Sequence, residues 1–308
     1  MSATEIEVVS PGALTTIQDL GRFGYAHFGI SPAGAADALS LRIANRIVGN
    51  NDNAAGIEMT LIGATLRFRS SCTIALVGAE IGTSAVPMFE PVPVNPGYIL
   101  ECGLLRDGAR TYVAVAGGIA VPKLLGSAST HLAAGFGGFH GRPLRRGDIL
   151  EIGAEARDAR AADPASLRAL ARARTRIRVT KGPQYHWFEE DVLMQFCASE
   201  YRVTEQSNRL GLRLSGRAVK PSSAGELLTE GVSLGAIQIP PNGQPIVLFI
   251  DQQTTGGYPK LANVIAADMH CIGKLRPRDT VRFELVSIGE AIQVLREQER
   301  VLAEAFHQ

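Results

Sequence analysis

The sequence lacks the features by which metal sites, redox motifs and membrane spans are usually recognised. Its four cysteines stand far apart and form no CxxC pair, which argues against a zinc knuckle or a thioredoxin motif. The six histidines show neither HExxH nor another ligand spacing, so we expect no metal site. No eighteen apolar residues run together, and the first residues contain no basic region or long apolar core. We therefore expect a cytoplasmic protein with reduced thiols that does not enter the membrane.

An excess of charge of either sign is also missing. Lys plus Arg number 31 and Asp plus Glu number 30, so no global field gathers nucleic acid or an anionic membrane. The most basic stretch, within residues 154–175, has no aromatic residues between its arginines. We expect neither a nucleic-acid partner nor a membrane partner, and look for a small molecule in a pocket.

Nucleotide and nucleophile motifs are absent as well. The sequence contains no GxxxxGK[ST] phosphate loop and no GxSxG nucleophile elbow. GFGGFHG at residues 135–141 approaches a dinucleotide fingerprint, but His140 replaces its last glycine. A turn and a strand follow it, whereas that fingerprint requires a helix. A glycine-rich β-turn is the simpler interpretation.

Glycine and proline are abundant instead, with 33 and 16 residues, which favours short strands joined by turns. The first set of β-rich runs is EIEVVS, ATLRFRS, TIALVGAE, YILECG, TYVAVAGGI and DILEIG. The second set is RIRVTKG, YRVTE, LRLSG, IQIP, PIVLFI and TVRFELV. The pattern predicts a β-rich lobe over residues 1–153, a solvated linker with a short exposed helix over 154–175, and a second β-rich lobe over 176–308.

Two longer helices interrupt this pattern. The spacing of Leu39, Ile43 and Ile47 predicts a helix over residues 37–48, with Ser31 or Asp37 as N-cap and Gly49 as the stop. From Ser287 onward, apolar residues recur on roughly one face and predict a closing amphipathic helix: Ile288, Ile292, Leu295, Leu302 and Phe306.

DQQTTGGYPKLANV, residues 251–264, follows the apolar run PIVLFI and combines amides, hydroxyls, glycines, a tyrosine and a lysine. Amide side chains both donate and accept hydrogen bonds, and glycines let backbone N–H groups approach a ligand closely. Such a set suits a small planar amide, while Lys260 and Arg209 could bind a carboxylate or phosphoryl group. The alternative is a β-turn in which Gln and Thr cap strands and Lys260 lies in solvent.

Three segments, residues 205–216, 226–250 and 251–264, resemble the family of 5-oxoprolinase C subunits, which is similar to allophanate hydrolase subunit 2 and to the carboxyltransferase domain of urea carboxylase. The ordered signature TEG, IQIP and QTTGGYPK carries the resemblance. TIQDLGRFGYAHFGISPAGAADALSLRIANRIVGN and STHLAAGFGGFHGRPLRRGD agree with it, so it extends from about Val8 to about Val286. Asn208 stands where the family pattern has an aspartate.

The resemblance implies a mainly β fold with a few helices, in two β-barrel-like lobes of which the C-terminal one is cyclophilin-like. It implies an ATP-dependent amide hydrolase that opens the lactam ring of 5-oxoproline to glutamate. Glu230 or Asp251 would move the lactam proton, while Gln238, Gln253 and the Gly256 and Gly257 amides would hold the oxygen. We assign catalytic roles to Glu230, Asp251, Gln253 and Lys260. We assign substrate binding to Asn208, Arg209, Gln238, Thr254, Thr255, Gly256, Gly257 and Tyr258.

Each role has a plain alternative, since Glu230 could cap a turn and Asp251 could pair with Arg209 in a structural bridge. Likewise Gln18, Asp19 and Arg22 of QDLGR could face the same cleft or anchor the first lobe. The resemblance further implies hetero-oligomeric partners: a protein like the B subunit of 5-oxoprolinase (allophanate hydrolase subunit 1-like), a LamB/YcsF-like A subunit, and ATP bound by or with the partner.

Two other functions stay open. One is carboxyl transfer in a urea carboxylase or amidolyase system on a urea-like substrate, with carboxybiotin arriving on another chain because no Met-Lys pair occurs here. The other is a non-enzymatic role like that of the Kip antagonist, which relieves inhibition of a sporulation kinase. We expect the isolated chain to be inactive and to form a stable complex with its companion subunit; a pure binding module would sequester its partner without turnover.

Overall fold

The computed structural model describes residues 4–83, 86–154, 158–160, 162–222 and 227–306. Residues 155–157 and 161 of the predicted linker, and residue 226 of the predicted site segments, lie outside this description. The chain divides into two compact units. Unit 1 contains residues 1–22, 33–172 and 300–308, and unit 2 contains residues 23–32 and 173–299.

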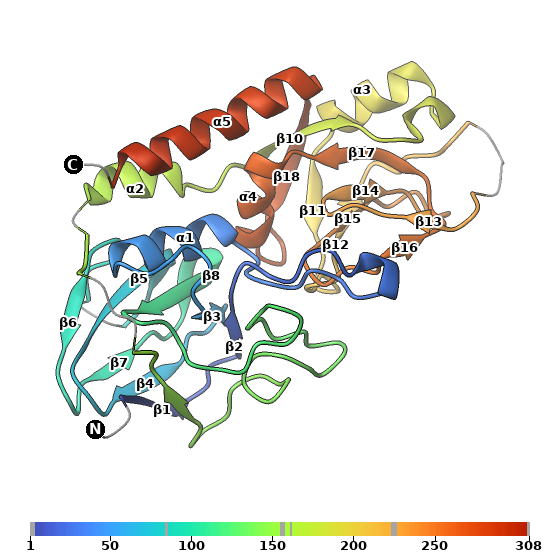
Figure 1. Ribbon diagram of the computed structural model, residues 1–308. Helices are drawn as coiled ribbons and strands as arrows, with labels where there is room; N and C mark the ends of the chain where they lie inside the picture. The colour runs from blue at the N-terminus through green and yellow to red at the C-terminus, as the bar shows by residue number, and fades with distance from the viewer. Residues whose placement is uncertain (1–3, 84–85, 155–157, 161, 223–226, 307–308) are drawn as a thin grey trace. The chain divides into compact units, whose positions relative to one another are not determined.

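Unit 1 holds two antiparallel sheets (Figure 1). The four-stranded sheet has the order β7-β4-β1-β9, with bounds Ile99–Glu101, Thr65–Phe68, Glu5–Ser10 and Ile149–Glu151. The five-stranded sheet has the order β2-β3-β8-β5-β6, with bounds Leu14–Gln18, Gly56–Thr60, Leu105–Val115, Cys72–Ile81 and Val92–Val94. Alternating apolar residues of the strands, such as Ile6, Val8, Leu66 and Phe68, are fully buried in one core.

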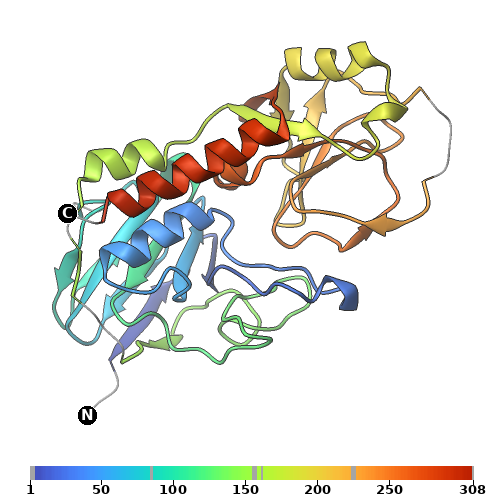
Figure 2. The ribbon, with the colours of Figure 1, turned by 45° about the horizontal axis from the view of Figure 1, so that its top comes forward.

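Helix α1, Ala38–Ile47, packs on β5 and β8 of the five-stranded sheet (Figure 2). Of the two predicted caps, Asp37 performs the role, because its carboxylate accepts a hydrogen bond of 2.9 Å from the N–H of Ser40. Leu39, Ile43 and Ile47 are buried as their spacing predicts, and Gly49 follows the helix with a φ of 78°.

A short helix lies within residues 154–175, the segment predicted as a linker. Helix α2, Pro164–Leu170, begins after Asp163, whose carboxylate accepts from two backbone N–H groups at 3.2 and 3.0 Å. Its Leu167 is fully buried in the core of unit 1, so the helix is not merely a solvated connection.

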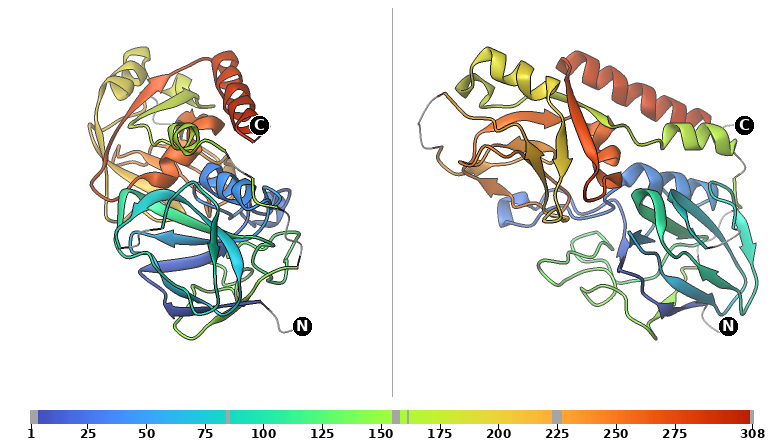
Figure 3. Two further views of the ribbon diagram at one scale, coloured as in Figure 1. Left: turned by 90° about the vertical axis from the view of Figure 1, so that its left-hand side faces the viewer. Right: turned by 180° about the vertical axis from the view of Figure 1, so that it is seen from behind.

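Unit 2 is built on a closed barrel of seven strands in the order β10-β17-β14-β15-β12-β11-β18 (Figure 3). Their bounds are Arg176–Lys181, Lys260–Val264, Ala236–Gln238, Ile246–Leu248, Gly211–Gly216, Tyr201–Val203 and Thr280–Leu285. The pairing of β10 with β18 is parallel and closes the barrel, whereas the other barrel pairs are antiparallel. The mainly β fold with a few helices is confirmed.

Shorter elements complete unit 2. The helical ones are η1 (Ala26–Phe28), η2 (Tyr185–Trp187), α3 (Glu190–Ala198), η3 (Ala266–Asp268) and α4 (Met269–Lys274). A two-stranded ribbon pairs β13, Glu230–Gly231, with β16, Thr255–Gly256. Helix α3 packs on β18, where the rings of Phe196 and Phe283 stack at 4.6 Å.

Helix α5, Ile288–Glu304, is the predicted C-terminal helix, but only its last turns are buried as expected. Leu302 is fully buried and Phe306, just past the helix, is 8% exposed, and both belong to the core of unit 1. Ile288 and Ile292 are 71% and 46% exposed. The apolar spacing therefore predicted the helix correctly and overstated the length of its buried face.

Candidate functional site

A pocket of about 510 Å³ lies in unit 2 beside the ends of its barrel strands. Four of the twelve predicted site residues line it: Asn208, Gln238, Gln253 and Tyr258. The remaining lining residues are Leu210, Gly211, Arg213, Pro240, Pro241, Asn242, Ile246 and Leu248. This mixture of an apolar wall with a few polar groups is typical of small-molecule sites, and the volume is in their usual range.

Gln238 is the most unusual group in the pocket. It ends β14, is only 1% exposed, and its Oε1 accepts a hydrogen bond of 3.4 Å from Nε2 of Gln253. Its own Nε2 is buried and finds no hydrogen-bond acceptor in the part of the chain that the structure describes. A buried polar group without a partner costs stability, so this donor calls for an explanation, and a bound ligand is one.

Gly256 leaves room for this amide. A Cβ atom at position 256 would lie 2.5 Å from Nε2 of Gln238 and 3.2 Å from Cγ1 of Val232. The glycine in QTTGG is therefore explained by the position of the amide, and not by a positive φ angle. Thr255 belongs to the same strand of the ribbon, and Thr254 and Gly257 flank it, but none of the three lines the pocket.

Lys260 and Glu230 form an ion pair outside the pocket lining. Lys260 begins β17 and is 2% exposed, while the Glu230 side chain is 42% exposed. Gln184 holds both partners, donating to Oε1 of Glu230 at 2.7 Å and accepting at 3.2 Å from the backbone N–H of Lys260. The hydrogen bond from Lys260, followed by that from Gln184, lowers the pKa of Glu230 from its ordinary value of 4.5.

Arg209 and Asp251 form a second, more deeply buried pair. Their side chains are 7% and 2% exposed and meet through hydrogen bonds of 2.8 Å from Nε and 3.2 Å from Nη2. The backbone N–H of Asp251 also donates to the carbonyl of Arg209 at 2.9 Å. This is the geometry of the structural bridge that the sequence left as an alternative, and neither residue lines the pocket.

Sequence reasoning missed Arg213, which stands on β12 and is an exposed cation of the pocket. The sequence contained a weak indication of this position. Arg213 stands between Leu212 and Leu214, and in a strand its side chain must lie on the face opposite to theirs. Pro240, Pro241 and Asn242 were missed as well, because the turn in IQIPPNGQP was assigned no role.

Gln18, Asp19 and Arg22 lie in unit 1, where Asp19 is fully buried. Its carboxylate accepts hydrogen bonds from the Ser127 hydroxyl at 2.6 Å and from the Ala128 N–H at 2.7 Å. Arg22 is 2% exposed and donates to the carbonyl of Ser129. These contacts are those expected of the anchoring alternative for QDLGR.

Two classes of chemistry find no support among the described residues. No three His, Cys, Asp or Glu side chains gather there as a metal site would require. Burial raises the pKa of the Cys72 thiol to about 11 and that of Cys102 to about 12, which disfavours both as nucleophiles.

No helix within the described ranges is long and apolar enough to span a bilayer.

The chain matches the family model "Carboxyltransferase domain, subdomain A and B" over residues 28–285. It is 40% identical to the C subunit of 5-oxoprolinase from Escherichia coli K12, covering 96% of each chain. It is 35% identical to the urea amidolyase of Saccharomyces cerevisiae, covering 97% of this chain and 17% of that one.

Among solved structures, the Kluyveromyces lactis urea amidolyase superposes with a TM-score of 0.91 at 32% identity, over 99% of this chain and 20% of that one. The resemblance predicted from the sequence signature is thereby confirmed. The chain belongs to the carboxyltransferase domain family, subdomains A and B, and is similar over 96% of its length to the C subunit of 5-oxoprolinase.

Proposed function

We propose that this chain is the C subunit of an ATP-dependent 5-oxoprolinase, which opens the lactam ring of 5-oxoproline to glutamate. The observation that carries the proposal is the 40% identity to the Escherichia coli protein of that name over 96% of both chains. A second relative of the same name, from Haemophilus influenzae, is 37% identical and is also covered over 95% of its length. The similarity therefore extends over nearly all of the subunit.

We place the lactam in the pocket of unit 2, with its carbonyl oxygen at Nε2 of Gln238. Negative charge develops on that oxygen when the lactam is activated or attacked, and a buried donor stabilises it without having to reorganise. Gln253 supports this role, because its amide donates to Oε1 of Gln238, which leaves Nε2 of Gln238 as the end of that amide without a partner among the described residues. Tyr258, 44% exposed at the pocket, adds a hydroxyl near the mouth.

We assign the carboxylate of 5-oxoproline to Arg213. It is the one basic side chain among the residues that line the pocket, whereas Arg209 and Lys260 are each held by a carboxylate. Asn208 keeps a local role, since its Oδ1 accepts from the backbone N–H groups of Leu210 and Gly211 at 2.8 and 3.4 Å. Glu230 and Asp251 are each paired with a cation, Lys260 and Arg209 respectively. These ion pairs make the predicted role of either carboxylate as a proton carrier less favourable.

We place ATP on the partner subunits. The pocket supplies one guanidinium and several amides, which is too little cationic charge for a triphosphate, and the glycine-rich loop 135–141 leads into strand β9 instead of a helix. When bound, ATP would supply activation of the lactam oxygen. This chain would then bind and orient the lactam, next to a B-subunit-like protein and a LamB/YcsF-like A subunit.

The test is Gln238→Leu in the enzyme assembled from co-expressed subunits, assayed for ATP-dependent release of glutamate from 5-oxoproline. Loss of one such donor is expected to lower kcat about a hundredfold. Stability should change little, because leucine fills a similar volume and removes a buried donor that has no acceptor, while Gln253 loses the acceptor of one long hydrogen bond.

Gln206→Ala, which changes an exposed amide outside the pocket lining, is the matched control and should retain wild-type kcat. Wild-type turnover by a folded Gln238→Leu enzyme would exclude the assignment of the oxygen site. An assembled wild-type enzyme that releases no glutamate would exclude the function itself.

Carboxyl transfer is the second candidate, supported by the match to urea amidolyase and by the TM-score of 0.91. A urea group has the same planar amide face as a lactam and would meet the same donors. The chain spans only 17% of the yeast protein, so biotin and its carrier would have to come from another chain. Carboxylation of urea by this chain with an added carboxybiotin carrier, without turnover of 5-oxoproline, would favour this function.

A further inference from the structure

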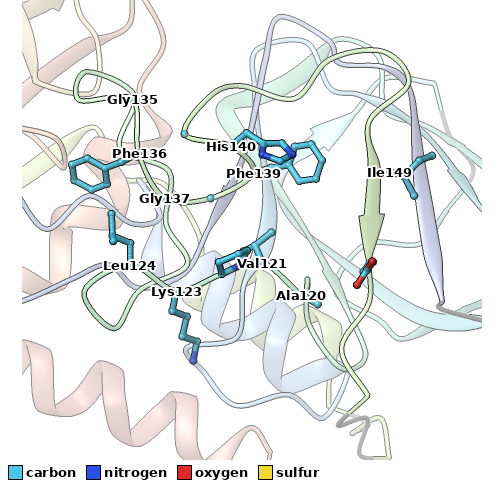
Figure 4. A pocket seen from close by; sticks show the side chains of 14 residues that line it. Ala120, Val121, Lys123, Leu124, Gly135, Phe136, Gly137, Phe139, His140 and Ile149 are labelled. Carbon is cyan, nitrogen blue, oxygen red and sulfur yellow. The ribbon is translucent and has the colours of Figure 1, made fainter.

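Unit 1 contains a pocket of about 550 Å³ that the proposed function does not use. Its wall consists of residues 120–124, the glycine-rich loop 135–141, and Ile149 and Glu151 of β9. Figure 4 shows Phe136 and Leu124 on one side, Ile149 on the opposite side, and Phe139 and His140 between them above Val121 and Lys123. Its volume and largely apolar wall are those of a small-molecule site.

The glycine-rich loop 135–141 packs against Arg22 and against the segment that contains Ser129 and Thr130. Arg22 stacks over the ring of Phe136 at 4.9 Å and donates to the carbonyl of Ser129. A Cβ atom at Gly137 would lie 2.2 Å from that carbonyl oxygen, and one at Gly138 would lie 1.8 Å from Oγ1 of Thr130. The loop therefore rests directly on the segment that Asp19 fixes, and the pocket is preformed.

The backbone of this loop is suited to an anion. Five of its seven residues have positive φ angles, namely Gly135, Gly137, Gly138, His140 and Gly141. Within the described ranges, the N–H groups of Gly138, Phe139 and His140 donate to no recorded acceptor. Successive amides in turns of this kind can form concave anion sites, and these three N–H groups belong to residues that line the pocket.

Charges of both signs stand around the pocket. Lys123 and Glu151 are exposed, and neither forms an ion pair with any residue that the structure describes. In Figure 4 the Lys123 side chain extends away from the two rings, and its flexible four-carbon stem is long enough to turn toward the mouth. A ligand with a single charge would satisfy only one of these groups.

We propose that this pocket binds a zwitterionic amino acid with an apolar side chain. Lys123 and the free N–H groups of loop 135–141 bind its carboxylate, Glu151 binds its ammonium group, and Phe136 and Phe139 contact its side chain. The proposal rests on unit 1 alone and does not depend on the chemistry proposed for unit 2.

Calorimetric titration of the full-length chain with L-phenylalanine, 3-phenylpropanoate and 2-phenylethylamine tests it. The two analogues lack the ammonium and the carboxylate group respectively, so each is expected to bind about tenfold more weakly than the amino acid. Lys123→Met should weaken binding of the amino acid and of 3-phenylpropanoate about tenfold and leave the amine unaffected. Glu151→Gln should weaken the amino acid and the amine and leave 3-phenylpropanoate unaffected.

Arg106→Met and Glu101→Gln are matched controls, because both change exposed charges of unit 1 outside the pocket lining, and neither should alter any of the three affinities. Since all four substitutions are at exposed positions, equal Tm values will verify that folding is retained. The proposal would be overturned by equal affinity for the three compounds, or by no saturable binding at millimolar concentration. It would also be overturned if Lys123→Met did not selectively weaken the two carboxylate ligands and Glu151→Gln the two ammonium ligands.

Discussion

Arg209 and Asp251 are both buried and bind one another through two hydrogen bonds. Taking two charges out of water is unfavourable, and their mutual attraction offsets this only while both are present. The pair joins β12, which begins at Gly211, to the segment that follows β15. The guanidinium of Arg209, which could have bound a ligand, instead holds the loop that carries Gln252 and Gln253.

We expect Asp251→Asn to lower the free energy of unfolding by about 3 kcal/mol, because it leaves the buried guanidinium without its counter-ion. Urea unfolding of the isolated chain measures this as a lower midpoint. Arg209→Met combined with Asp251→Leu should recover most of the loss, since neither charge then remains buried. An unchanged midpoint for Asp251→Asn, with activity lost in the assembled enzyme, would instead assign Asp251 to catalysis.

At the scale of elements, Lys260, Glu230 and Gln184 connect β17, β13 and the turn before η2. The ribbon of β13 and β16 carries Gly256, whose absent side chain accommodates the Gln238 amide. The ion pair thus ties the ribbon to the start of β17, where Lys260 pairs with Gln238 of the pocket.

This pair makes stability depend on acid pH. The pKa of Glu230 is lower in the folded chain than its ordinary 4.5, so its stabilising contribution is complete above about pH 4.5 and is lost as the pH falls through the folded-state pKa. We expect Glu230→Gln to reduce the decrease in Tm between about pH 5 and pH 3. Thermal melts across that range measure it.

Lys260→Met removes the principal cause of the lowered pKa and should reduce the same decrease. Wild-type pH profiles for both variants would show that the pair contributes nothing to folding at acid pH.

At the scale of the whole molecule, the parts for turnover are incomplete. In the described part of the chain, the pocket of unit 2 contains amides, a tyrosine and an arginine but no cysteine, serine or carboxylate that could act as a nucleophile. We therefore expect the isolated chain to release no glutamate from 5-oxoproline and ATP, and to form a stable complex with its B-subunit-like partner. Size-exclusion chromatography of the co-expressed pair and assays of each fraction test this, and ATP-dependent hydrolysis by the chain alone would refute it.

Sequence by itself determined the family, most strands and the first helix. Short β-branched runs between turn residues predicted both strand sets, and Asp37 with Gly49 marked the ends of α1, because these signals depend on neighbours a few residues away. The ordered signature around QTTGGYPK fixed the family for the same reason. The short strands β13 and β16, by contrast, carried no periodicity that could be recognised.

Only the tertiary structure decided which polar residues share a pocket. Asp251 meets Arg209 across 42 positions, and Lys260 meets Glu230 across 30, so no local pattern shows that these charges are already paired. Closure of the barrel sets Gln238 beside Gln253 and brings Arg213 to the same pocket. A sequence contains the donors and charges, but their neighbours across strands depend on the strand order, and the neighbours determine which groups are left for a ligand.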